Sequence, residues 1–95
     1  LICDSALTKQ IVGYMQELPI PGLVPYPGVS ANASEDFASV AERVPSAFLY
    51  LSAGFLDERG DAPAHNPKVR FNEEVCPIGV SCLTHCAIRW LEENR

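Results

Sequence analysis

Apolar residues recur at helical spacing in three stretches of the chain, which predicts three helices. The first stripe, at positions 7, 11, 15 and 18, predicts a helix that begins at Asp4 or Ser5 and ends near Leu18. The second stripe, at positions 37, 40, 41 and 44, follows Ser34, a favourable N-cap. The third helix begins at Asn72 and carries a broad apolar face, made by Val75, Ile78, Cys82, Leu83, Cys86, Ala87, Trp90 and Leu91.

Two short apolar runs predict β-strands between these helices. Ala47–Leu51 is continuously apolar and is followed by turn residues, which is typical of a strand buried on both faces. Leu23–Val24, extending to Tyr26, predicts a shorter strand, and Pro25 favours an edge position for it. Because a helix separates the two strands, we expect a parallel pair with a right-handed crossover and an α/β fold. So few elements cannot cover a sheet, so we expect a fragment or a subunit completed by a partner.

The composition is that of one globular domain or part of one. The chain has 95 residues, of which 47% are hydrophobic and 20% charged, and its net charge is −5. Nucleic acids and anionic membranes bind basic surfaces, and this chain has a net negative charge. We therefore expect neither as a partner. No apolar stretch approaches the roughly 20 residues of a membrane span.

Three of the four cysteines lie on or beside the last predicted helix. Cys82 and Cys86 are one helical turn apart and flank His85, which raises the hypothesis of a metal or redox cluster. Both cysteines also fall on the apolar stripe, and free cysteine commonly behaves as a small core residue. We therefore expect reduced core thiols, hence a cytoplasmic location, and a solvated or half-buried His85.

Two loops leave the carboxyl ends of the predicted strands, where open α/β sheets bind ligands. One loop reaches Ser34 and the other reaches His65, whose imidazole has the chemistry of a metal ligand. Taken alone, His65 is more typical of a surface histidine. Glu35 and Asp36 are more typical of carboxylates that complement a helix dipole than of an acid–base pair.

Six short motifs follow one another in a fixed order along the chain. They are Ser34-Glu35-Asp36-Phe37, Val44-Pro45, Ala47-Phe48-Leu49-Tyr50-Leu51 with Ala53-Gly54, His65-Asn66-Pro67, Phe71-Asn72-Glu73-Glu74 and Pro77-Ile78-Gly79. The series resembles the C-terminal part of the catalytic domain in the metal-dependent aminoacylase, carboxypeptidase and hippurate hydrolase superfamily. The branch it resembles most includes hippurate hydrolases, auxin-conjugate amidohydrolases and N-acyl-diaminopimelate deacetylases.

The resemblance implies that residues 1–95 are a segment of a three-layer α/β catalytic domain, without its N-terminal half and its lid or dimerisation domain. Such enzymes use a pair of zinc, manganese, cobalt or nickel ions, and the family's His-Asn-Pro histidine, a metal ligand, matches His65. The family's Ser-Glu-Asp-Phe segment borders the substrate pocket, which makes Ala33, Ser34 and Glu35 the expected substrate-binding residues. The family usually has Met-Gly where this chain has Asn32-Ala33, which leaves the substrate class open.

The function implied by the resemblance is metal-assisted hydrolysis of the amide bond in N-acyl amino acids. The family's general base lies upstream, so we expect no catalytic residue here and no activity from the isolated chain. The expected partners are the substrate and the remainder of the catalytic domain, and a homodimer stays open. The alternative hypothesis is a stand-alone, non-enzymatic module for oligomerisation or interaction.

Overall fold

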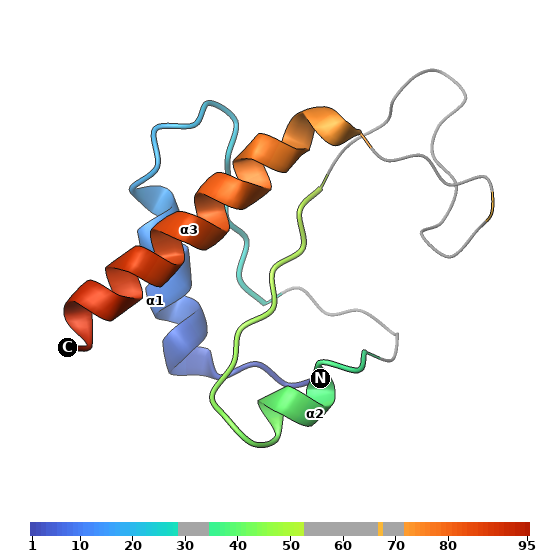
Figure 1. Ribbon diagram of the computed structural model, residues 1–95, viewed down its shortest axis with the longest axis vertical. Helices are drawn as coiled ribbons and strands as arrows, with labels where there is room; N and C mark the ends of the chain where they lie inside the picture. The colour runs from blue at the N-terminus through green and yellow to red at the C-terminus, as the bar shows by residue number, and fades with distance from the viewer. Residues whose placement is uncertain (29–34, 53–66, 68–71) are drawn as a thin grey trace.

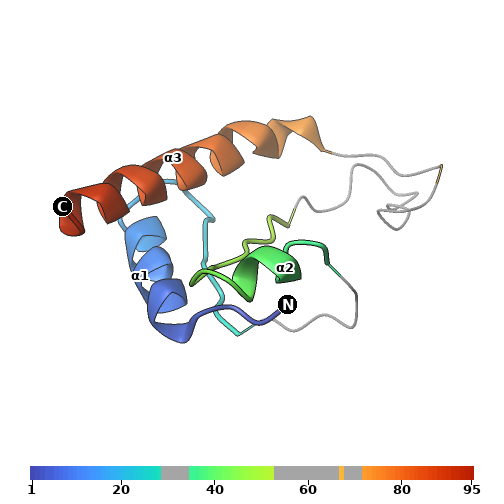
Figure 2. The same ribbon diagram turned by 60° about the horizontal axis from the view of Figure 1, so that its bottom comes forward.

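The computed structural model describes residues 1–28, 35–52, 67 and 72–95 (Figure 1). The regular elements among these residues are the helices α1 (Ser5–Gln16), α2 (Ala38–Ala41) and α3 (Cys76–Glu93), with a 3₁₀ helix, η1 (Glu73–Val75), directly before α3. The long helix α3 crosses α1, as Figures 1 and 2 show, and these two helices are in direct contact. None of the described helices is long and apolar enough to span a membrane.

Helix α1 begins where the sequence predicts because Asp4 caps it. The Oδ1 atom of Asp4 accepts a hydrogen bond from the backbone amide of Leu7 at 2.7 Å. This bond satisfies one of the free amide groups that every helix start presents. The amides of Glu17 and Leu18 add a final turn of i−3 hydrogen bonds after the helix ends at Gln16. The predicted helix is therefore confirmed.

Asn72 also has its predicted role at the start of the last helical segment. Its Oδ1 atom accepts from the amide of Glu74 at 3.1 Å and caps η1. Pro77 then lies in the first turn of α3, where a missing amide hydrogen removes no helical hydrogen bond. The helix continues to Glu93, so this prediction is confirmed with a short 3₁₀ turn at its start.

The second predicted helix is much shorter than the apolar stripe suggests. Only Ala38–Ala41 is α-helical, and the N-cap is Phe37, not Ser34, which lies outside the described residues. The carboxylate of Glu35 accepts from the amide of Phe37 at 3.3 Å, and the amides of Ala38 and Ser39 make i−3 bonds to the carbonyls of Glu35 and Asp36, so that a turn precedes α2. At the other end Pro45 disfavours helical backbone in the preceding residue.

The predicted α/β fold with short parallel strands is wrong for the part of the chain that the structure describes. Neither Leu23–Val24 nor Ala47–Leu51 is a strand, and the described residues contain no strand pairing. The prediction that Ala47–Leu51 is buried on both faces is also wrong, since the side chain of Tyr50 is 67% exposed. A strand exists only through hydrogen bonds to a neighbouring strand, which a local apolar run cannot supply.

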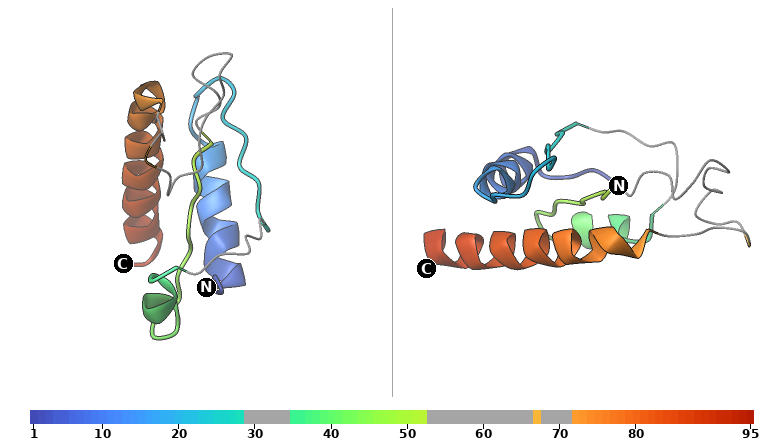
Figure 3. Two further views of the ribbon diagram at one scale, coloured as in Figure 1. Left: turned by 90° about the vertical axis from the view of Figure 1, so that its right-hand side faces the viewer. Right: turned by 90° about the horizontal axis from the view of Figure 1, so that it is seen from above.

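The segment 45–52 lies between α3 and residues 21–28, as both views of Figure 3 show. The amide of Asp4 donates to the carbonyl of Ser46 at 2.8 Å and so ties the segment to the start of α1. Gly79 of α3 allows close approach to its other end, because a Cβ atom there would lie 3.3 Å from Cδ2 of Leu51. These contacts hold the segment in place without a sheet.

The core of the described structure lies where α1 meets α3. Its buried apolar side chains are Tyr14 of α1 with Cys82 and Cys86 of α3. The cysteines of the chain are free, so the prediction of core thiols at positions 82 and 86 is confirmed. With so small a core, the stability of each helix end matters for the whole chain.

We expect Asp4→Ala to lower the free energy of unfolding by about 0.5–2 kcal/mol, because the amide of Leu7 loses its acceptor. Asp4→Asn is the matched control, since asparagine keeps a capping oxygen. Urea unfolding followed by far-UV circular dichroism measures both variants. An equal loss of stability in the two variants would contradict the role of this cap.

Candidate functional site

The structure describes one of the four residues that the sequence predicts for the site. His65, Ala33 and Ser34 lie outside the described residues, and their roles stay predictions. Glu35 is exposed just before α2, where its carboxylate accepts from the amide of Phe37. This local bond gives Glu35 a structural role at the helix start and leaves its predicted contact with substrate untested.

Glu35 lies on the lining of a wide apolar groove with a volume of about 1340 Å³. The described residues that line the groove come from α1, residues 21–28, residues 48–52 and the first turns of α3. Lys9 and Glu35 are the charged residues among them, and apolar side chains dominate, including Met15, Val24, Phe48, Leu51, Ile78 and Leu83. The ring of Phe48 packs on those of Phe37 and Tyr50, with centroid distances of 5.4 and 5.2 Å. This volume is larger than the roughly 300–1,000 Å³ of a typical small-molecule pocket.

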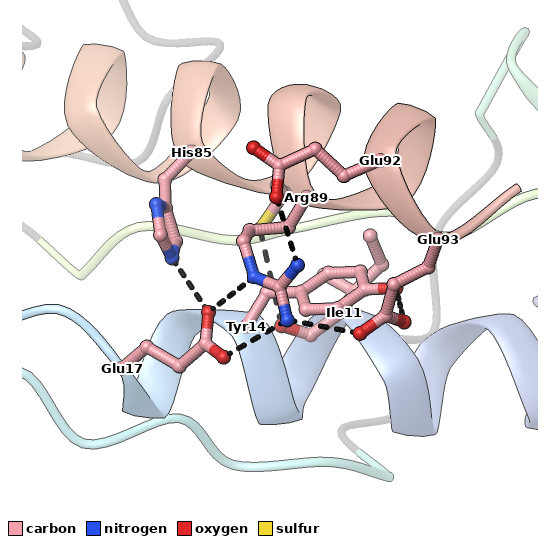
Figure 4. Close-up of polar contacts among 8 residues, drawn as sticks. Ile11, Tyr14, Glu17, His85, Arg89, Glu92 and Glu93 are labelled. Atoms are coloured by element: carbon pink, nitrogen blue, oxygen red, sulfur yellow. Dashed lines mark hydrogen bonds and ion pairs between the residues drawn. The ribbon is translucent and has the colours of Figure 1, made fainter. Parts of the chain in front are cut away.

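A polar cluster joins α3 to the end of α1, as Figure 4 shows. We call it the α1–α3 clasp and define it as Tyr14, Glu17, His85, Arg89, Glu92 and Glu93. The carboxylate of Glu17 accepts from Nε2 of His85 at 2.9 Å and from Nε and Nη2 of Arg89 at 3.0 and 3.3 Å. Two side chains of α3 therefore bind one carboxylate at the end of α1.

Arg89 is the centre of the clasp. Besides Glu17, its guanidinium donates to Glu92 at 3.1 Å and to Glu93 at 2.9 Å. The guanidinium carbon also lies 5.2 Å from the centroid of the Tyr14 ring, which is a cation–π contact. The hydroxyl of Tyr14 donates a hydrogen bond to Glu93 at 2.6 Å. Tyr14 therefore contacts both Arg89 and Glu93 of α3.

These contacts shift the pKa values of the clasp in the direction expected for structural ion pairs. The pKa of Glu17 lies below its ordinary value because Arg89, and then His85, donate hydrogen bonds to its carboxylate. The hydrogen bond to Glu93 is the main cause of the raised pKa of Tyr14. Pairing with Glu17 raises the pKa of Arg89 further above neutrality. The shifts favour the charged forms of Glu17 and Arg89.

The hypothesis of a metal or redox cluster at Cys82, His85 and Cys86 finds no support among the described residues. His85 is bound to Glu17, and the thiol of Cys86 is 3.9 Å from the carbonyl of Ile11. Burial, and then the nearby Cys82, raises the pKa of the Cys86 thiol, which disfavours the thiolate that binds metals. The described chain holds no group of three potential ligands. His85, with 27% of its side chain exposed, is half-buried as predicted.

Comparison with known proteins shows one clear relationship. Over 62 residues the chain is 41% identical to IAA-amino acid hydrolase ILR1-like 2 of Arabidopsis thaliana, a match that covers 64% of this chain. This similarity supports membership of the amidohydrolase–hippurate hydrolase superfamily, as a fragment. The resemblance that the ordered motifs predict is therefore confirmed at the level of this superfamily.

The chain spans only 14% of the length of this superfamily relative. No protein-family model and no solved structure matches the chain.

The α1–α3 clasp is not among the features predicted from the sequence. The spacing of Arg89 to Glu92 and Glu93 is typical of ion pairs within a helix and could have been read directly. Glu17 lies 72 positions before Arg89, and a single sequence gives no signal for such a contact.

We expect acid to weaken the contact between α1 and α3. The pKa of Glu17 is lowered in the folded chain, so its contribution to stability is present above its unfolded value of about 4.5 and is lost as the pH falls below that value. The free energy of unfolding of Glu17→Gln should therefore fall less between pH 6 and pH 3 than that of the unsubstituted chain.

Urea unfolding at several pH values measures this difference. Glu42→Gln is the control, because it removes the same charge from an exposed residue of a different segment. If the Glu17→Gln profile ran parallel to that of Glu42→Gln, Glu17 would not be a source of the acid sensitivity.

Proposed function

We propose that this chain is part of a metal-dependent amidohydrolase that cleaves the amide bond of N-acyl amino acids or similar conjugates. The observation that carries the proposal is the 41% identity over 62 residues to a protein named as an IAA-amino acid hydrolase. The ordered motifs, above all His65-Asn66-Pro67, support the same assignment. The acyl group and the amino acid of the substrate stay open, since Asn32-Ala33 replaces the family's usual Met-Gly pair.

We assign His65 as a metal ligand in this enzyme. A neutral imidazole offers one ring nitrogen to a metal while the other is held by a hydrogen bond. Bound divalent metal ions, from the group of zinc, manganese, cobalt and nickel, would polarise the amide carbonyl and lower the pKa of a water molecule.

Ala33, Ser34 and Glu35 border the substrate in this proposal. They precede α2, and Glu35 also lies on the lining of the apolar groove. The hydrogen bond from the amide of Phe37 would orient the carboxylate of Glu35. The general base and the other metal ligands lie in the part of the enzyme that has no counterpart in this chain, so the 95 residues alone are expected to be inactive.

The remainder of the catalytic domain is the proposed partner of the apolar groove. Large hydrophobic side chains are exposed along α3, among them Val80, Leu83, Ile88 and Leu91. Full burial of such a side chain stabilises a protein by about 1.5–3 kcal/mol, so the described surface favours a large apolar cover. This chain matches 14% of the relative's length, so a full-length enzyme of that size would have enough additional residues to cover the surface. A homodimer that covers part of this surface is an additional proposal.

In the full-length enzyme we expect His65→Ala to lower kcat/KM for an N-acyl amino acid by roughly 100-fold or more and to reduce the bound metal, because a direct ligand is lost. Hydrolysis assays and metal analysis by mass spectrometry measure the two effects. The matched control is His85→Ala, the other histidine of the chain, which binds Glu17 and should keep most of the activity.

Two outcomes would contradict this assignment. One is normal metal content and turnover in the His65→Ala enzyme. The other is turnover by the isolated 95-residue chain well above that of its own His65→Ala variant. The absence of hydrolase activity in the metal-loaded full-length protein would favour the non-enzymatic module instead.

Leu83 tests the proposed cover, because it lines the groove and is 65% exposed. In the isolated chain Leu83→Gln should change the free energy of unfolding by no more than about 0.5 kcal/mol. In the full-length enzyme the same substitution should cost about 1.5–3 kcal/mol, because a buried apolar side chain is replaced by a polar one. Arg43→Gln, at an exposed position after α2, is the control in both proteins. Equal effects of Leu83→Gln in the two proteins would count against a cover at this position.

A further inference from the structure

The described helices differ in how many contacts they make with one another. The described helix α2 is not in contact with any other described helix, whereas α1 packs on α3. The buried apolar side chains of the described chain, Tyr14, Cys82 and Cys86, all lie where α1 meets α3. The hydrophobic contribution to stability is therefore concentrated in one helix pair.

The polar contacts between distant parts of the described chain are concentrated there as well. The guanidinium of Arg89 makes two hydrogen bonds to Glu17 at the end of α1 and lies over the ring of Tyr14. On its own helix it binds Glu92 and Glu93. Single exposed ion pairs contribute little, but a planar guanidinium that binds a carboxylate through two nitrogens within a network is the favourable exception.

We propose that Arg89 is a strap that makes α1 and α3 a self-supporting unit, which stays folded when α2 and the segment 45–52 open. One arginine can have a large effect on stability because the hydrophobic core is small, with three buried apolar side chains. Regions with few buried contacts open locally at low free-energy cost. Helix α2 contacts no other described helix, and Ser46 is the only buried residue of the segment 45–52. The helix pair would then present one wall of the groove before any partner covers it. This inference does not depend on the hydrolase assignment.

Amide hydrogen exchange on the full 95-residue chain tests the strap. In the unsubstituted chain the amides of α1 and α3 should exchange together and more slowly than those of α2. Arg89→Ala should speed exchange in both α1 and α3 by roughly 5- to 30-fold, since the strap joins them. Arg89→Lys should give an intermediate effect, because lysine keeps the charge but lacks the planar fork. Arg43→Ala, which removes an equal charge at an exposed position, should leave both helices unchanged.

Three results would overturn the proposal. In the first, α1 and α3 of the unsubstituted chain exchange as fast as α2. In the second, Arg89→Ala speeds exchange only in the last turn of α3, which would show that the arginine stabilises its own helix alone. In the third, Arg43→Ala has the same effect as Arg89→Ala. Complete loss of helicity in Arg89→Ala with a folded Arg43→Ala chain supports the strap.

Discussion

The described structure depends on the contact between α1 and α3. Its apolar part is small, with Tyr14, Cys82 and Cys86 as the buried apolar side chains, and the α1–α3 clasp closes it on the solvent side. Both His85 and Arg89 donate to Glu17, the residue directly after α1, so one carboxylate joins residues separated by most of the chain. The other described segments are attached to this pair by fewer contacts, such as the amide of Asp4 to the carbonyl of Ser46.

The same small core connects the fold to the proposed function. A helix pair with an apolar groove on one side and exposed Val80, Leu83 and Leu91 along α3 has more apolar surface than it can bury by itself. In the proposed enzyme further chain would cover this surface, since the relative is far longer than these 95 residues. In the proposed enzyme the helix pair is a wall of the catalytic domain.

The sequence predicted best what local chemistry decides. Asp4 and Asn72 start their helices because a capping oxygen acts on an amide two or three residues away. The predicted strand at Ala47–Leu51 is wrong because strand pairing depends on a distant neighbour. The predicted helix after Ser34 is too long because its first residues form a turn and Pro45 disfavours helix at its end. The contact between Glu17 and Arg89 could not be predicted either, because the two residues lie far apart in the chain.

The candidate site was predicted from an ordered series of residues and not from geometry. The order of the motifs was sufficient to identify the superfamily, which the identity to the hydrolase confirms. It could not place His65 relative to Glu35, because short motifs specify residue types while distances depend on the packing of the whole domain. The described residues include Glu35 alone of the predicted set.

The most direct test is to locate the metal in the full-length enzyme by anomalous X-ray scattering. The account predicts a divalent ion with a ring nitrogen of His65 as a ligand, at about 2.0–2.1 Å if the ion is zinc. It also predicts that this ion faces the chain at Ala33 and Ser34. An ion bound entirely by other residues, with His65 on the solvent-exposed surface, would contradict the central claim.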